Sequence, residues 1–248
     1  MALCCNTFSV VARCPRSGEL GIAISTALPA VGGLCVYIEP GVGAAATQSW
    51  VNPYLALDAL KALAGGTTPE AALESVLAAD PETDLRQIGL VDALGQAGAW
   101  TGPACTDWAG HILGEGFAVQ GNMLVGPDTI ESMAAVMQST VHRGMADRLL
   151  AALLTGQHAG GDKRGKQSAA VKVYGEEAYP LVDLRVDDHS EPVVELARLK
   201  ALAEVQLQPF VASLPRRQGT ASVPLSEDDR ALIMTPPTLR PTAAGGRR

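Results

Sequence analysis

The spacing of apolar residues switches repeatedly between strand and helix patterns, and this switching constrains the fold more than any other feature. Alternating, β-branched segments at 7–13 and 20–26 flank a turn containing Pro and Gly, which predicts a hairpin. Segments 34–39 and 41–50 predict a second pair of strands. Gly41 and Gly43 in the latter indicate a close approach of two backbones.

Helical spacing replaces alternation after residue 50. Two helices are predicted at 52–66 and 67–80, the second with Thr68 as its N-cap and Pro69 in its first turn. The remaining predicted elements are a hairpin at 87–92 and 96–101, a strand at 116–124, helices at 126–140 and 145–158, strands at 167–175 and 181–188, and one long helix at 191–214.

This order of elements defines the expected class. Strands come as hairpins and alternate with pairs of helices, which predicts an α+β fold of antiparallel sheets covered by helices. Aromatic residues make up only 4% of the chain and hydrophobic residues 47%, so the core is expected to consist of Ala, Val and Leu. We expect one domain at 7–213, a leader at 1–6 and a flexible tail at 214–248, which has little periodicity.

Composition and charge exclude several classes of function. The net charge of −7 argues against a nucleic-acid partner and against a membrane surface. No apolar run approaches the roughly 18 residues of a membrane span, and the start resembles no signal peptide. The five cysteines lack metal-ligand spacing, which predicts reduced thiols in a cytoplasmic protein. Asp187, Asp188 and His189 are adjacent, but consecutive residues of a strand face opposite ways, so they cannot converge on one metal ion unless the chain turns. Because the cysteines and histidines also lack ligand spacing, we expect no metal and no organic cofactor.

Thr7 is the first candidate for chemistry. A threonine that opens a strand is most simply a β-former. If Thr7 instead becomes the first residue of the chain, its free α-amine can deprotonate its own hydroxyl, which supplies nucleophile and base on one residue. An α-amine with a pKa near 8 needs little adjustment for this task.

Polar residues at two strand ends are the next candidates. Gln48 and Ser49 end a strand of small residues, where they either mark a corner before a helix or contact a ligand. Asn122 follows a glycine and either holds a turn or donates a hydrogen bond to an oxyanion.

The segment GGDKRGKQS at 160–168 gathers glycines and charges directly before a predicted strand. It is either a solvated turn or one wall of a site. Asp162 and Arg164 are close enough to pair with each other or to hold a substrate carboxylate. The spacing does not match a phosphate-binding loop. Gln167 and Ser168 follow on the way into the strand.

The whole pattern resembles the DUF1028 family, over about residues 7–212. The segments that carry the resemblance are TFSVVAR, SGELGIAIST, GVGAAATQSWVNP, RQIGLVDALGQAGAWTG, GFAVQGNML, AGGDKRGKQSAAV and VDLRVDDH. The family resembles the Ntn-hydrolase superfamily in fold, which implies a four-layer αββα sandwich. In that superfamily the nucleophile is the first residue of the mature chain and opens the first strand.

Thr7 occupies the nucleophile's place, because related chains often begin Met-Thr-Phe-Ser. Here Met1–Asn6 precede it, so three alternatives remain: the start codon was placed too early, the Asn6–Thr7 bond is cut, or this copy is not activated. The proteasome branch uses an acid and a lysine beside its threonine, and no clear equivalents occur in the first strands here.

The expected site therefore combines the resemblance with the candidates above. We assign catalytic roles to Thr7, Asn122, Asp162 and Ser168, and substrate binding to Ser25, Gln48, Ser49, Arg164 and Gln167. The first hypothesis is an amidohydrolase acting on a small amide, ureide or peptide-like substrate. The second is a non-catalytic ligand-binding or scaffold protein on the same fold. The expected partners are a small-molecule substrate and further copies of this chain in a homo-oligomer.

Overall fold

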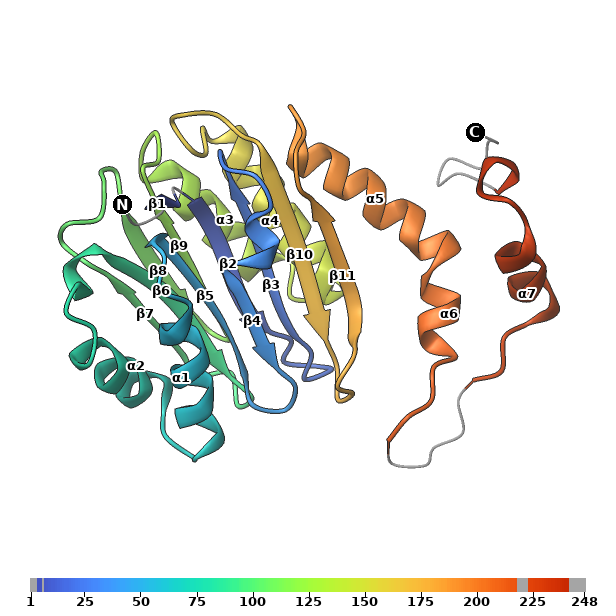
Figure 1. The fold of residues 1–248 in the computed structure, drawn as a ribbon, viewed down its shortest axis with the longest axis horizontal. Helices are drawn as coiled ribbons and strands as arrows, with labels where there is room; N and C mark the ends of the chain where they lie inside the picture. Colours follow the sequence, from blue (N-terminus) through green and yellow to red (C-terminus); the bar gives the residue numbers. More distant parts are fainter. Residues whose placement is uncertain (1–3, 6, 218–222, 241–248) are drawn as a thin grey trace. The chain divides into compact units, whose positions relative to one another are not determined.

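The computed structural model describes residues 4–5, 7–217 and 223–240, in two compact units that divide between Val193 and Val194. The first unit contains two antiparallel sheets (Figure 1). The larger sheet has the strand order β11-β10-β3-β2-β9-β8. Its strands are β2 (Thr7–Arg13), β3 (Leu20–Thr26), β8 (Gly110–Gly114), β9 (Phe117–Asn122), β10 (Ser168–Tyr174) and β11 (Pro180–Val186).

The second sheet is built around β5, which pairs with β6 along one edge and with β4 and then β1 along the other. β7 pairs with the far edge of β6. The strands are β1 (Cys4–Cys5), β4 (Val36–Glu39), β5 (Gly43–Trp50), β6 (Arg86–Asp92) and β7 (Ala97–Thr101).

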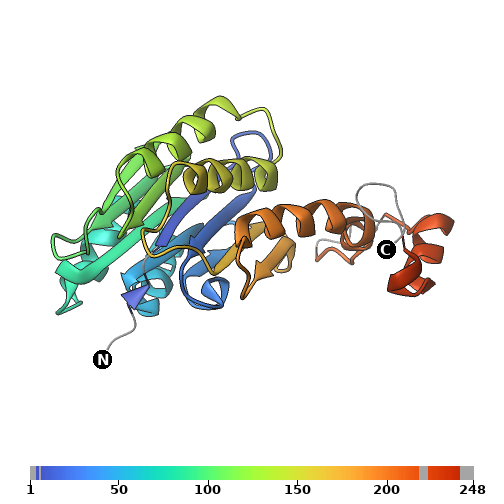
Figure 2. The same cartoon turned by 90° about the horizontal axis from the view of Figure 1, so that it is seen from above.

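Helices cover the outer face of each sheet. Leucines and alanines of α1 (Pro53–Ala64) and α2 (Pro69–Ala78) form one buried cluster with Ala45, Ile88 and Leu90 of the second sheet. Figure 2 shows α3 (Asp128–Ser139) and α4 (Met145–His158) lying along one side of the strands of the larger sheet. The result is the expected α+β, four-layer αββα sandwich. Short 3₁₀ turns at Val31–Gly33 and Thr83–Leu85 complete this unit.

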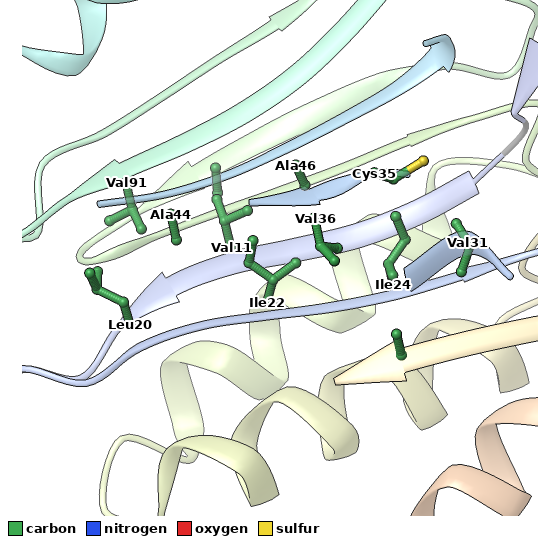
Figure 3. Packing of buried hydrophobic residues seen from close by; sticks show 12 residues of the cluster. Val11, Leu20, Ile22, Ile24, Val31, Cys35, Val36, Ala44, Ala46 and Val91 are labelled. Atoms are coloured by element: carbon green, nitrogen blue, oxygen red, sulfur yellow. The ribbon is translucent and has the colours of Figure 1, made fainter. Parts of the chain in front are cut away.

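The two sheets face each other across an apolar layer, shown in Figure 3. Val11, Ile22 and Ile24 of the larger sheet are completely buried against small residues of the second sheet. Those partners include Ala44 and Ala46, and their small size lets the two backbones approach closely. The expected Ala, Val and Leu residues are present in this layer, together with isoleucines that the expectation did not include.

Two glycines of the second sheet make room for their neighbours, Gly43 on the side of α1 and Gly89 on the side of the facing sheet. A Cβ atom on Gly43 would lie 2.6 Å from the carbonyl oxygen of Val91 on the paired strand and 2.8 Å from Cδ1 of Leu63 in α1, so the close approach expected at Gly43 is confirmed. The same expectation was wrong for Gly41, where a Cβ atom would meet nothing within 4 Å and where the φ of 74° favours glycine instead. A Cβ atom on Gly89 would lie 2.1 Å from Oε1 of Gln120 on the facing sheet. Gly89 therefore makes room for a polar side chain inside the sandwich.

Several elements differ from the sequence-based expectation. The strand β8 was not predicted, because its five residues include two glycines and give little alternation. The predicted helix at 191–214 is two helices, α5 (Pro192–Gln206) and α6 (Gln208–Ala212). Pro209 explains the break, because proline lacks the N–H needed inside a helix and disfavours a helical residue before it.

The expected tail at 214–248 contains regular structure. Helix α7 (Glu227–Met234) begins at Ser226, whose side chain accepts a hydrogen bond from the backbone of Asp229, and a 3₁₀ turn follows at Pro237–Leu239. Three acidic residues in the first turn of α7 stabilise the helix, because their negative charges lie at the positive end of the helix dipole. Residues 218–222 and 241–248 of this tail, and residues 1–3 and 6 of the expected leader, lie outside the described residues.

Candidate functional site

The site is built on a row of four polar side chains across the larger sheet. Antiparallel register places Ser168 opposite Thr26, Thr26 opposite Thr7, and Thr7 opposite Asn122, on the four adjacent strands β10, β3, β2 and β9. The side chains of residues paired across neighbouring strands lie on the same face of a sheet. Side chains alternate between the two faces along each strand, and Val11 and Ile24 point toward the other sheet, so this row points toward the other sheet as well. All four residues are at most 1% exposed. The hydroxyl of Thr7 donates to that of Thr26 over 3.3 Å.

A second polar row on the smaller sheet faces the first. Register places Gln48 of β5 opposite Gln87 of β6, and Gln87 opposite Thr101 of β7. Nε2 of Gln48 donates to the carbonyl oxygen of Thr7 over 3.2 Å and to Oε1 of Gln87 over 2.8 Å. Nδ2 of Asn122 donates to the same Oε1 over 2.9 Å. Gln87 thus joins both sheets, and Gln48 fixes the backbone of Thr7.

Farther from Thr7 along the strands, the space between the sheets contains one more set of polar contacts and then becomes apolar. Nε2 of Gln120 donates to Oγ of Ser9, which donates to Oε1 of Gln48, each over 2.6 Å. The next inward-facing positions are apolar, beginning with Val11 and Ala118. The space between the sheets therefore has a polar end at Thr7 and an apolar middle.

The polar end is neutral and incompletely paired. Among the described residues, no ionisable side chain hydrogen-bonds to the hydroxyl of Thr7. Oδ1 of Asn122 and Oε1 of Gln120 are buried acceptors without a hydrogen-bond partner. A buried acceptor left without a partner costs about 1–3 kcal/mol. Such a group beside Thr7 is suited to receive a donor that the described chain does not supply.

Two residues at the polar end, Ser49 and Met123, have a strained backbone conformation. Ser49 follows Gln48 with φ of 66°, and Met123 follows Asn122 with φ of 52°. Left-handed conformations of residues other than glycine cost about 1–3 kcal/mol and cluster at functional sites. Oγ of Ser49 is buried beside the thiol of Cys105; burial raises the pKa of Cys105, and the hydrogen bond between these two groups opposes that rise.

The glycine-rich loop lies beside the same end of the sandwich. The carboxylate of Asp162 is buried and pairs with Arg164 at 2.9 Å, as the sequence suggested. Oδ2 of Asp162 also accepts from the backbone N–H of Ala27, one residue beyond Thr26. The backbone N–H of Gln167 donates to the carbonyl oxygen of Thr26 over 2.8 Å. The loop is therefore tied to the strand end that neighbours Thr7.

Three of the expected site residues have other contacts. Ser25 is paired with Phe8 on the opposite face of the sheet from Thr7, and its hydroxyl donates to the carbonyl oxygen of Ser168. The hydroxyl of Ser168 donates to the carbonyl oxygen of Leu28 and accepts from the backbone of Val31, so it holds the 28–31 turn.

The side-chain amide of Gln167 donates to Asp188 over 3.0 Å, beyond the end of β11. Gln167, like Ser25, is thus directed away from Thr7, and the contacts of both side chains support structural roles. The structure brings together Thr7, Gln48 and Asn122, with Ser49 next to Gln48 and the loop of Asp162 and Arg164 beside them.

The segment before Thr7 lies across the other sheet. Cys4 pairs with Trp50 and Cys5 with Ser49, at the end of β5. The chain then enters β2 of the larger sheet at Thr7. Residues 4–5 therefore bridge the two sheets at the polar end, and Thr7 is completely buried with this segment in place.

Sequence reasoning missed four members of the network. Thr26, Ser9, Gln87 and Gln120 give no motif, because single polar residues in strands are common. What identifies these residues is the strand register, because each lies an even number of residues from an inward-facing residue on its own strand and so points inward as well. That pattern becomes readable only when the pairing of the strands is known.

The described residues define a four-layer αββα protein whose central strand opens with a buried threonine between two polar rows. The chain belongs to the DUF1028 family, described as a family of unknown function, whose sequence model matches residues 7–196. A crystal structure of protein SPO2555 from Silicibacter pomeroyi, assigned to the same family, is similar at 30% identity and a TM-score of 0.78. The similarity covers 85% of this chain and 95% of that one.

Two more distant structures are also similar. Anbu, an ancestral β-subunit from Yersinia bercovieri, has 12% identity and a TM-score of 0.39, over 84% of this chain and 98% of that one. Anbu from Hyphomicrobium sp. strain MC1 has 10% identity and a TM-score of 0.38, over 85% and 99%. Among curated proteins, none matches this chain.

Two structural findings concern membranes and metals. Of the helices in the described residues, none is long and apolar enough to cross a bilayer. Within the same residues, no group of three or more His, Cys, Asp or Glu side chains is placed to hold a metal ion.

Proposed function

We propose that this protein is an N-terminal-nucleophile amidohydrolase in which Thr7 attacks a small amide, ureide or peptide-like substrate. The observation that carries the proposal is the position of Thr7. It opens a central strand and faces a neutral polar network with an unpartnered acceptor, and among the described residues no side-chain base contacts its hydroxyl. A base is therefore missing unless the α-amine of Thr7 itself supplies one.

The proposed reaction uses Thr7 twice. The free α-amine takes the proton of Oγ1 as this oxygen attacks the substrate carbonyl, and the same proton passes to the departing amine as the C–N bond breaks. The resulting ester on Thr7 is then hydrolysed by water, which restores the hydroxyl and releases the acid. Oδ1 of Asn122, buried without a partner, is suited to accept a hydrogen bond from the protonated α-amine.

The oxyanion needs donors at the same place. Nδ2 of Asn122 carries two N–H groups, and Gln87 accepts from this nitrogen. Oγ of Ser49 is buried but lies beside the thiol of Cys105, so it is not available to the oxyanion as it stands. We assign oxyanion stabilisation to Asn122, where loss of one donor typically costs about 3–4 kcal/mol of barrier.

Removal of the preceding segment is part of the proposal. Cleavage before Thr7 would create the α-amine and would also release residues 4–5 from the end of β5. Ser49 and Trp50 would lose that backbone cover, which opens the polar end to a substrate. The chain that keeps residues 1–6 is then an inactive precursor.

Arg164 is proposed to bind the substrate, with Asp162 as its positioning residue. Arg164→Lys is expected to lower kcat/KM about tenfold, because lysine keeps the charge but loses the planar fork. Its side chain is one-third exposed, so the melting temperature should change little. Arg16→Lys, the same change on an exposed arginine, is the control. Equal kcat/KM for wild type and Arg164→Lys would remove this loop from the site.

The function is tested with two forms of the protein, one retaining residues 1–6 and one whose first residue is Thr7. Both are incubated with fluorogenic amides, ureides and short peptides, and separately with a fluorophosphonate that labels nucleophilic hydroxyl groups. We expect hydrolysis, and a label mapped to Thr7, for the second form alone. If neither hydrolysis nor labelling of Thr7 occurs in the Thr7-first form, the non-catalytic ligand-binding alternative is favoured.

A further inference from the structure

A cavity of about 490 Å³ lies at the other end of the sandwich from Thr7. It opens beside Arg13, the last residue of β2, six residues along the strand from Thr7 and roughly 20 Å away. Its walls come from the turns after β2, β6 and β8 and from the C-terminal half of α3. They include Arg13, Leu94, Glu115, Phe117, Met137 and Val141.

Arg13 brings an unused donor to this cavity. Its Nε is buried and has no hydrogen-bond partner. A Cβ atom on Gly95 would lie 3.7 Å from Cδ of Arg13, so the stem of the side chain is packed beside the turn between β6 and β7. Within the described residues, Arg13 forms no ion pair. A guanidinium that lines a cavity and has no acidic partner is suited to a carboxylate, to which guanidinium groups often bind through two parallel hydrogen bonds.

A second guanidinium lies behind the cavity wall. Arg148 of α4 is 1% exposed, and its Nη2 donates to the carbonyl oxygen of Met137 over 2.7 Å. Its Nε and Nη1 are buried without partners, and no acidic side chain pairs with it among the described residues. Burial lowers the pKa of Arg148, which shows how little solvent it contacts. An anion bound nearby would gain from this uncompensated positive charge.

Apart from Arg13, Glu115 and Gln138, the side chains that line the cavity are apolar. Phe117 and Met137 are buried in the wall, while Leu94 and Val141 are exposed at its rim. Small-molecule sites typically have volumes of about 300–1,000 Å³, and this cavity lies in that range. Glu115 also lines the cavity, and its negative charge opposes anionic ligands, more strongly those with two negative charges than those with one.

We propose that this cavity is a second small-molecule site that binds an organic monocarboxylate with an apolar body. The carboxylate binds the guanidinium of Arg13, and the apolar body lies against Phe117 and Met137. The site is independent of the polar end at Thr7 and of the proposed hydrolysis there.

The probe is 4-phenylbutyrate, with 4-phenylbutanol as the matched neutral compound, and binding to the full chain is measured by titration calorimetry. We expect saturable binding of the acid and at least tenfold weaker binding of the alcohol. Arg13→Met should weaken acid binding at least tenfold. Arg16→Met, the same loss of charge in the neighbouring turn, and Arg164→Lys, at the Thr7 end, should each change it less than twofold.

Leu94→Asp gives a second variant that is safe for folding, because Leu94 is 79% exposed in a turn. It places a negative charge on the rim and should weaken acid binding at least fivefold. The proposal is overturned if the acid shows no saturable binding, if the alcohol binds equally well, or if neither Arg13→Met nor Leu94→Asp changes the affinity.

Discussion

Thr7→Ala is expected to reduce amide hydrolysis by about a thousandfold or more while leaving the fold intact. The variant removes the proposed nucleophile, and loss of a nucleophile that forms a covalent intermediate has effects of this size or larger. Its structural cost should be small, because the hydrogen bond from the side chain of Thr7 to Thr26 is long, at 3.3 Å. One such bond contributes about 1 kcal/mol to the free energy of unfolding.

The comparison uses protein that begins at residue 7, assayed on the amides described above and by fluorophosphonate labelling. Thr7→Ser is the matched control, because serine keeps a hydroxyl next to the α-amine and should retain measurable activity. Thr26→Ala is a second control that removes the partner of the hydrogen bond without removing the nucleophile. Hydrolysis by Thr7→Ala at the rate of the wild type would contradict a role for Thr7 in the chemistry.

Gln87→Met is expected to destabilise the protein by about 3–5 kcal/mol, since several buried groups would lose a partner together, each at a cost of about 1–3 kcal/mol. Methionine has a similar length, so the cost comes from lost hydrogen bonds and not from lost volume. Nε2 of Gln87 donates to Thr101 and to the carbonyl oxygens of Gly110 and Gly121. Its Oε1 accepts from Gln48 and Asn122.

The measurement for Gln87→Met is chemical or thermal unfolding of the full chain, where this change corresponds to a drop of about 10 °C in Tm. Gln96→Met is the matched control, because Gln96 is exposed in the turn between β6 and β7. It should shift Tm by no more than about one or two degrees, as surface substitutions usually do. A Gln87→Met protein as stable as the Gln96→Met protein would show that the network does not hold the sheets together.

The order of strands and helices could be predicted from the sequence, because the spacing of apolar residues within short segments determines it. Alternation at 7–13 and 20–26 and helical spacing after residue 50 are both properties of short segments. The break between α5 and α6 at Pro209 was not predicted, although the proline is visible in the sequence and prolines interrupt helices.

The site was predictable only in part, for a physical reason. Thr7 and Asn122 could be named from strand ends and from resemblance, but their pairing across β2 and β9 depends on register. Gln87 joins the two sheets through contacts between residues far apart in the chain, and nothing in its own segment distinguishes it. Ser25 was wrongly assigned to the site, because the face of the sheet on which it lies depends on the same register and is the one opposite to Thr7.

The mature N-terminus gives the most direct test of the proposed nucleophile. The gene is expressed from residue 1 without added residues, and the intact mass of the purified protein is measured alongside its hydrolysis of the amides. Periodate, which cleaves the amino alcohol of an N-terminal threonine, identifies that residue independently. We predict a hydrolytically active protein whose mass corresponds to residues 7–248 and which reacts with periodate. An active protein that retains residues 1–6 would contradict the proposal.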